Sequence, residues 1–267
     1  MKKMYAIRSG LIMLFLLNFC GIAVSQSKTS IKIFTFNILH GANTDGSFNL
    51  DLIAEVIQQT DADLVALQEV DRHTKRAKNY DLVTELGIRT KMAPLFGRAM
   101  YYDGGEYGEG VLSKHSIVGS RAVPLPHLPD SEPRTALEIT IRLPQGDTLQ
   151  FIATHLDHLD EPTDRIMQVQ KIVSVFKVNS HPTILAGDLN DVPESTPITI
   201  LKEIFTPAYL PESAYPTYPS DKPTIKIDYI MTLSKDPWKV VKREVVCHPL
   251  ASDHCGYLVE LELLNEN

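Results

Sequence analysis

The chain has 267 residues, of which 43% are hydrophobic and 22% are charged, a balance that suits one large globular domain with a substantial core. Its formal net charge is −7 at neutral pH, and this acidic balance disfavours a tight, non-specific grip on a polyanion such as nucleic acid. A local basic cleft or a bound metal would still permit an enzyme that acts on nucleic acid.

The first 25 residues have the pattern of a secretory signal peptide. Lys2, Lys3 and Arg8 precede an apolar run over residues 11–24, and Ala23-Val24-Ser25 offers small residues for cleavage. The run is shorter than the roughly 20 residues that a membrane span needs. We therefore expect cleavage near Ser25 and export to the periplasm or the extracellular space, with no transmembrane segment in the mature chain. An anchor at this end, through a lipid on Cys20 or through an uncleaved segment, is the alternative, although Phe19 fits lipoprotein processing poorly.

The mature domain, residues 26–267, loses three basic residues with the leader, so its net charge becomes −10. Its cysteines are Cys247 and Cys255. In an exported protein these two could form a disulfide. The interpretation that we favour is two buried thiols on adjoining strands.

Hydrophobic periodicity divides the mature chain into strands and helices. Strands are predicted at residues 31–38, 64–67, 110–113, 136–143, 149–154, 183–186, 227–233, 240–246 and 257–264. Helices are predicted at 50–59, 80–86 and 163–178, and Pro- or Gly-rich rim loops at 101–110, 124–133 and 206–224. Because strands outnumber helices and alternate with them irregularly, the pattern indicates an α/β (α+β) fold with mixed sheets.

Polar or ionisable residues recur where the apolar runs end. The run TILAGDLND (183–191) shows this most clearly, because its apolar residues are followed by Asp188 and Asn190. Burying a carboxylate at the end of such a strand costs free energy, because the charged group loses its hydration. Each case alone is also typical of an ordinary strand exit. The recurrence at six places indicates a single site, and its members are Asn37, Glu69, His155, His158, Asp188, Asn190, Asp228, Asp253 and His254.

These residue types suit hydrolysis of a phosphate ester, which needs a divalent cation and an oriented water. Mg²⁺ prefers oxygen ligands, and Glu69 is the best candidate, with support from Asn37 and Asp253. Asp188 suits the role of orienting or deprotonating water, and Asn190 could stabilise an oxyanion without titrating. His254, with Asp228 to orient its ring, suits a contact with the phosphate or a leaving oxygen.

The sequence also resembles the endonuclease/exonuclease/phosphatase superfamily, which shares its fold with DNase I. The resemblance covers essentially all of residues 31–263. It rests on seven segments in the family's order: FNILHG (36–41), ALQEVD (66–71), GEGVLS (108–113), THLDH (154–158), GDLN (187–190), KIDYI (226–230) and SDH (252–254). The stretch from Asn37 to Asp71 and residues 217–230 look most like the compact secreted bacterial branch.

This resemblance implies a four-layer α/β/β/α sandwich of two mixed sheets flanked by helices, with the site at one edge of the sheets. It implies an Mg²⁺-dependent hydrolase, with Mn²⁺ as an alternative ion, in which Glu69 is the chief metal ligand and His155 is a second histidine facing the phosphate. The chain departs from the pattern at three positions. Leu39 replaces a carboxylate near the metal, and Glu109 replaces the common Asn. Lys226 replaces the common Arg, and a plain surface charge is one interpretation of it. We expect Glu109 to bond His155 and set its tautomer; a solvated loop position is the alternative.

The substrate stays open at this point. A small phosphorylated molecule or a lipid head group is favoured, nucleic acid is possible but not favoured, and a monomer is expected. Arg134, His158 and Tyr218 are predicted to contact the substrate, although Arg134 in a strand-edge salt bridge and Tyr218 as a plain surface tyrosine are equally good interpretations. The alternative to an enzyme is a binding module that keeps the same fold but has lost catalysis. The presence of every expected site residue weighs against this alternative.

Overall fold

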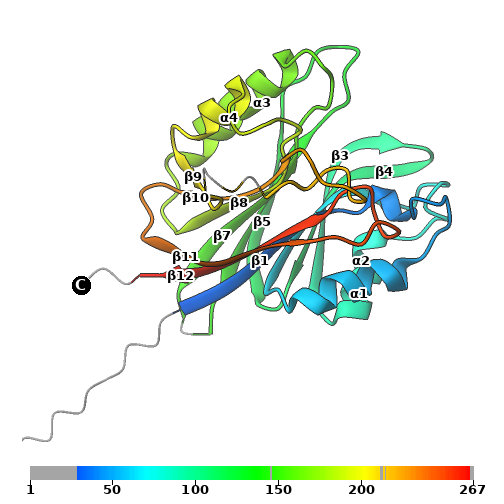
Figure 1. Cartoon of the computed structure of the whole chain (residues 1–267), viewed down its shortest axis with the longest axis horizontal. Helices are drawn as coiled ribbons and strands as arrows, with labels where there is room; N and C mark the ends of the chain where they lie inside the picture. Colours follow the sequence, from blue (N-terminus) through cyan, green and yellow to red (C-terminus); the bar gives the residue numbers. More distant parts are fainter. Residues whose placement is uncertain (1–28, 145, 211–212, 214, 265–267) are drawn as a thin grey trace, which may run out of the picture.

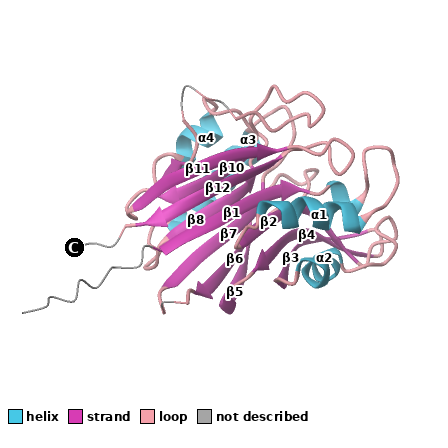
Figure 2. Cartoon of the chain, turned by 60° about the horizontal axis from the view of Figure 1, so that its bottom comes forward, coloured by secondary structure: helices cyan, strands magenta, loops and turns pink. Residues whose placement is uncertain are grey.

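The computed structural model describes residues 29–144, 146–210, 213 and 215–264, so the predicted signal peptide lies outside the described residues. Within these residues the main strands form two stacked six-stranded sheets (Figures 1 and 2). The first sheet has the order β11-β12-β1-β2-β4-β3 and the second has the order β5-β6-β7-β8-β10-β9. Each sheet holds a parallel pair at its centre, β1 with β2 and β7 with β8, and its other pairs are antiparallel.

The strands of the first sheet are β1 (Thr29–Asn37), β2 (Leu64–Arg72), β3 (Ala93–Tyr102), β4 (Gly105–Ser113), β11 (Trp238–Val246) and β12 (Gly256–Leu263). Those of the second are β5 (Ser116–Pro124), β6 (Thr135–Arg142), β7 (Thr148–His155), β8 (Thr183–Asp188), β9 (Phe205–Pro207) and β10 (Asp228–Leu233). The helices are α1 (Leu50–Thr60), α2 (Leu82–Thr90), α3 (Thr163–Phe176) and α4 (Thr196–Leu201), with a short 3₁₀ turn, η1, at Leu39–Gly41.

The two sheets and two pairs of helices make four layers. In Figure 1, α1 and α2 lie along one side of the stacked sheets, and α3 and α4 lie along the other. Three buried apolar clusters fill the spaces between the layers: one under α1 and α2, one between the sheets, and one under α3 and α4. The predicted α/β/β/α sandwich is therefore confirmed.

The central strands are apolar on both faces because each lies between a helical layer and the other sheet. In β2, Val65 and Leu67 point into the cluster under the helices, whereas Leu64 and Ala66 point into the cluster between the sheets. In β8, Leu185 points to the helices and its neighbours point to the facing sheet. This burial explains why the central strands appear in the sequence as uninterrupted apolar runs.

The elements absent from the sequence prediction are β3, β5, β9 and α4. The three strands lie at sheet edges. The side chains of β3 and β5 are largely exposed and carry no hydrophobic alternation, and β9 has only three residues, too few to show one. The expected loop at 101–110 is wrong, because β3 and β4 form a hairpin whose turn, Asp103-Gly104, has positive φ at both residues.

Among the described residues, every helix is too short or too polar to span a membrane.

Gly187 marks a close approach of two backbones beside the site. It lies in β8 and pairs with Thr154 of β7 and Tyr229 of β10. A Cβ added at this glycine would lie 1.8 Å from the backbone oxygen of Thr154, a contact that no side-chain movement can relieve. The strand therefore requires glycine directly before Asp188.

We expect Gly187→Ala to lower the free energy of unfolding by about 3 kcal/mol or more, because the added methyl forces two central strands apart. Gly119→Ala in the edge strand β5 is the matched control, since its new Cβ would meet only Thr140, at an ordinary 3.7 Å. Urea unfolding of both variants measures the difference. Equal losses of stability in the two variants would contradict this account.

Candidate active site

Strand alternation brings four of the predicted residues to one place between the sheets. Every second side chain of these strands points into the core between the sheets, as Ile33 does in β1. Four predicted residues continue this inward series: Asn37 of β1, His155 of β7, Asp188 of β8 and Asp228 of β10. Asp188 is the register partner of both His155 and Asp228. The inner faces of both sheets therefore end in polar side chains at the same edge.

Glu69 reaches the site through a local departure from strand geometry. The register between β2 and β4 shifts between Leu67 and Val70, and Glu69 has a left-handed backbone with φ of 56°. Such a bulge redirects a side chain and costs strain in a residue other than glycine. As a result, the Glu69 carboxylate lies 3.1 Å from the Asn37 side-chain nitrogen and 3.4 Å from Nδ1 of His40.

Asp188 is the centre of the buried network. Its Oδ2 lies 3.2 Å from the side-chain nitrogen of Asn37, 3.5 Å from Nε2 of His155 and 3.7 Å from Nε2 of His254. Its Oδ1 accepts a hydrogen bond from the backbone nitrogen of Asn190, whose own φ is 50°. Burial raises the pKa of Asp188 to about 7. The carboxyl group can therefore exchange a proton near neutral pH.

His254 forms a pair with Asp228. Nδ1 of the ring lies 3.1 Å from Oδ2 of the fully buried Asp228. Burial lowers the pKa of His254, but the carboxylates of Asp228 and Asp188 outweigh it and raise the pKa to about 10. The imidazole is therefore cationic at neutral pH, and the ring of Tyr218 packs against it with 4.9 Å between the ring centroids.

The segment that carries His254 is tied down on both sides. The hydroxyl of Ser252 donates to the backbone oxygen of Asn37 at 2.7 Å and accepts from the backbone nitrogen of His254. A disulfide joins Cys247, at the end of β11, to Cys255, directly after His254. The expectation of two free thiols is therefore wrong, although the two cysteines do flank adjoining strands as predicted.

His155 belongs to a second network built around Arg134. Nη1 of the buried Arg134 lies 3.0 Å from Nδ1 of His155, and Nη2 lies 3.3 Å from Nδ1 of His158. Because guanidinium only donates, Nδ1 of His155 accepts, and the proton of the neutral ring is on Nε2. Nε2 then points its hydrogen toward Oδ2 of Asp188, 3.5 Å away. The side-chain nitrogen of Asn190 lies 2.9 Å from Nε2, but it is a donor too and donates to the backbone oxygen of Leu156 at 3.0 Å. Burial and the positive charge of Arg134 hold the pKa of His155 well below its usual value.

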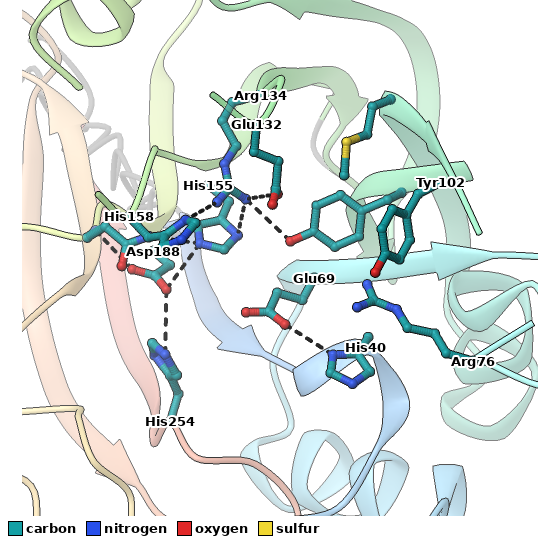
Figure 3. A pocket seen from close by; sticks show the side chains of 13 residues that line it. His40, Glu69, Arg76, Tyr102, Glu132, Arg134, His155, His158, Asp188 and His254 are labelled. Carbon is teal, nitrogen blue, oxygen red and sulfur yellow. Dashed lines mark hydrogen bonds and ion pairs between the residues drawn. The ribbon is translucent and has the colours of Figure 1, made fainter. Parts of the chain in front are cut away.

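These networks surround one cavity of about 320 Å³ (Figure 3). Of the predicted residues, Glu69, Arg134, His155, His158, Asp188, Asn190 and His254 line it. Tyr102 and Tyr107, in the segment expected to form a rim loop of the site, also line it. The other lining residues were given no role by the sequence analysis, and these are His40, Arg76, Met100 and Glu132. His40 could have been noticed within the FNILHG segment, whereas the others look like ordinary surface residues in the sequence.

Several predicted residues lie just outside the cavity lining. Asn37 contacts Glu69 and Asp188, and Asp228 contacts His254, without lining the cavity themselves. Tyr218 reaches the site only through its contact with the His254 ring. The carboxylate of Asp253 lies beside the Ser252 hydroxyl, at 3.5 Å. The proposed roles of Asn37 and Asp253 at a metal and of Tyr218 at the substrate stay predictions.

Two expectations from the sequence are corrected. Glu109 is buried, but the partner of His155 is Nη1 of Arg134, 3.0 Å from Nδ1, so Arg134 and not Glu109 sets the tautomer. Burial raises the pKa of Glu109 well above its usual value. Lys226 is not at the surface. Its ammonium group is buried 2.9 Å from the backbone oxygen of Asp228 and 3.8 Å from the centre of the Tyr257 ring, and burial lowers its pKa to about 7.

The acidic groups around the cavity fit a divalent cation in their chemistry. Glu69 presents a carboxylate to the cavity; although burial raises its pKa, the hydrogen bond from His40 helps to lower it to about 2, so the group is ionised. Asp188 and Asp228 offer carboxylate oxygens within 4.8 Å of each other, whereas His254, the third member of this cluster, could bind a metal only in its neutral form. Oδ1 of Asp228 is buried and has no hydrogen-bond partner. Hard oxygen donors of this kind suit Mg²⁺ or Mn²⁺.

Comparison with known proteins agrees with this geometry. Residues 34–254 match the profile of the endonuclease/exonuclease/phosphatase family, and the chain belongs to this family. Its members are hydrolases that act on phosphate esters or nucleic acids.

Solved structures of the same fold include proteins with different activities. A family protein from Bacteroides thetaiotaomicron has a TM-score of 0.72 and 19% identity, with 89% of this chain and 99% of that chain covered. A mannosyl-6-phosphatase from Bacteroides thetaiotaomicron VPI-5482 has a TM-score of 0.68 and 19% identity, with 86% and 99% covered. The 2′,3′-cyclic phosphatase ANGEL2 has a TM-score of 0.64 and 17% identity, with 88% and 96% covered. At these identities the likeness concerns the fold.

The His254–Asp228 pair leads to a prediction that can be tested without an activity assay. In Asp228→Asn, loss of the neighbouring negative charge should lower the pKa of His254 from about 10 to roughly 7–9. An NMR titration of the His254 ring in the metal-free protein measures this. Asp253→Asn is the control and should lower the pKa less, because that carboxylate does not contact the ring. An unchanged pKa in Asp228→Asn would show that Asp228 does not govern the charge of His254.

Proposed function

We propose that the chain is an exported, Mg²⁺-dependent phosphoesterase that hydrolyses a small phosphate ester by in-line attack of water, with Mn²⁺ as an alternative ion. The observation that carries this proposal is the convergence of Asp188, Asn190, His155 and His254 on one cavity beside the ionised Glu69. This set combines a base, neutral donors, a cation and a metal ligand.

Each side chain then has a role that follows from its charge. Asp188, whose pKa is near neutrality, holds and deprotonates the attacking water. His254, kept cationic by Asp228, donates from Nε2 to a phosphate or leaving oxygen. Asn190 and neutral His155 donate without titrating, and Arg134 fixes the His155 ring while it reaches the cavity itself.

The charge around the cavity supports metal dependence. The carboxylates of Glu69, Glu132, Asp188 and Asp228 outnumber the cations Arg134 and His254, since Asp71 neutralises Arg76 at 2.6 Å. The excess of carboxylates would repel a phosphate anion from the cavity unless a cation were bound with it. A divalent ion at Glu69 would supply that charge and polarise the phosphoryl oxygen.

The size of the cavity favours a small substrate. A volume of about 320 Å³ is at the lower end of ligand pockets, which span roughly 300–1,000 Å³. Met100 and Tyr102 of β3 and Tyr107 of β4 line one side. A nuclease acting on polymeric nucleic acid is the alternative, and it predicts faster turnover of an oligonucleotide than of small esters. Export is supported by the predicted signal peptide and by the disulfide, since disulfides persist mainly in oxidising compartments.

We expect the purified domain to hydrolyse bis-p-nitrophenyl phosphate with Mg²⁺ or Mn²⁺ and to lose this activity in EDTA. Glu69→Ala should raise the half-saturating metal concentration, because the carboxylate that faces the cavity is removed. Glu85→Ala, which removes a carboxylate that pairs with Arg89 on α2, should leave the metal titration unchanged. Full turnover in chelator, or an unshifted titration in Glu69→Ala, would refute the role given to Glu69.

We further expect Asp188→Asn to lower kcat by about 10²–10⁴-fold, the usual contribution of a general base. Asp191→Asn is a matched control three residues along the same segment, because Asp191 pairs with Arg165 at 2.9 Å and does not line the cavity. Steady-state kinetics at saturating metal distinguishes the two. Wild-type rates in Asp188→Asn would exclude Asp188 as the base.

A further inference from the structure

One part of the cavity takes no part in the proposed hydrolysis. Arg76, Met100, Tyr102 and Glu132 line it, and we call these four residues the outer subsite. Figure 3 shows Tyr102 and Arg76 on the side of the cavity away from Asp188 and His254, with Glu69 between the two groups. An ester whose phosphate contacts Asp188 and His254 would extend its alcohol portion toward this side.

Arg76 is held rigidly in the outer subsite. Its Nε and Nη2 lie 2.6 and 2.9 Å from the two carboxylate oxygens of Asp71, which is fully buried and also accepts from the Thr74 hydroxyl. Its guanidinium lies over the Tyr102 ring, 4.5 Å from the ring centre. These contacts use Nε and Nη2 and leave the hydrogens of Nη1 uncommitted. The side chain is 31% exposed, so the free donors can reach a ligand.

The charges of the outer subsite select the kind of group that it can hold. The positive charge of Arg76 is compensated by Asp71, and Glu132 adds a carboxylate whose Oε1 lies 3.0 Å from Arg134. No uncompensated positive charge is left for a second phosphate or a carboxylate. Hydroxyl groups are suited instead, because Arg76 donates, Glu132 accepts, and Met100 with Tyr102 offers apolar contact to the carbon skeleton.

We propose that the outer subsite binds an uncharged, hydroxyl-rich alcohol portion, such as a sugar ring, and that Arg76 determines this specificity. The proposal rests on the proposed phosphoesterase function and narrows its substrate to phosphate esters of polyols. It requires a single anionic group per substrate, the one that enters beside Asp188 and His254.

The test compares esters that differ in the alcohol. With Mg²⁺ or Mn²⁺ present, kcat/KM is measured for glucose 6-phosphate, glucose 1,6-bisphosphate and p-nitrophenyl phosphate, and bis-p-nitrophenyl phosphate monitors general activity. Wild-type protein should prefer glucose 6-phosphate over the bisphosphate by at least about 10-fold, because the subsite does not compensate a second anion. This comparison does not depend on any variant folding.

Arg76→Met tests the residue itself. The ratio of kcat/KM for glucose 6-phosphate to that for p-nitrophenyl phosphate should fall about 10- to 100-fold, the loss expected for charge-assisted hydrogen bonds to hydroxyls. Arg98→Met is the matched control, because Arg98 also pairs with a carboxylate, Glu106, and lies over a tyrosine of β3, Tyr101, but outside the cavity. Its ratio should equal that of the wild type.

The outcomes separate this inference from the proposed function. Turnover of bis-p-nitrophenyl phosphate without preference for glucose 6-phosphate, or a preference for the bisphosphate, would overturn the polyol subsite and leave the phosphoesterase intact. An unchanged ratio in Arg76→Met would remove Arg76 from the specificity. No turnover of any ester with either metal would overturn the proposed function and this inference with it.

Discussion

The site depends on one neutral donor placed between two carboxylates. The side-chain nitrogen of Asn37 lies 3.1 Å from Glu69 and 3.2 Å from Asp188, and thus joins acidic groups from two different sheets. Buried carboxylates in such proximity repel each other and lose hydration, so a shared donor reduces the cost of holding them together. The arrangement requires the two sheets to keep their relative position, which the apolar cluster packed between them maintains.

The same constraint explains which residues could be predicted from the sequence. His155, Asp188 and Asp228 continue the inward alternation of strands whose apolar runs are unmistakable, so both the strands and their polar ends were predictable. The edge strands β3 and β5 were not, because exposed strands carry no hydrophobic alternation, and β9 was not because it has only three residues. Helix α4 was missed because it has only six residues, although Ser195 as N-cap and Pro197 in the first turn signal its start.

Other features could not be predicted because they depend on contacts between distant segments. The bulge at Glu69 requires the register of β4, and the partner of His155 is Arg134, where the sequence suggested Glu109. Lys226 is buried against Tyr257, a residue 31 positions away, and so its charge gave no sign of burial. The outer subsite combines residues from three segments, each of which is typical of a protein surface when it is considered alone.

The pairing of β12 with β1 has a consequence for when this chain can become active during its synthesis. Thr35 pairs with Tyr257, and the Ser252 hydroxyl bonds the Asn37 backbone 215 residues earlier in the sequence. A nascent polypeptide that has not yet emerged past this point therefore lacks β12, the strand that joins β11 to β1, and the imidazole of His254 at the same time. Closing so long a loop is slow and entropically costly, which makes the addition of β12 the step that joins β11 to β1 and brings His254 to the site.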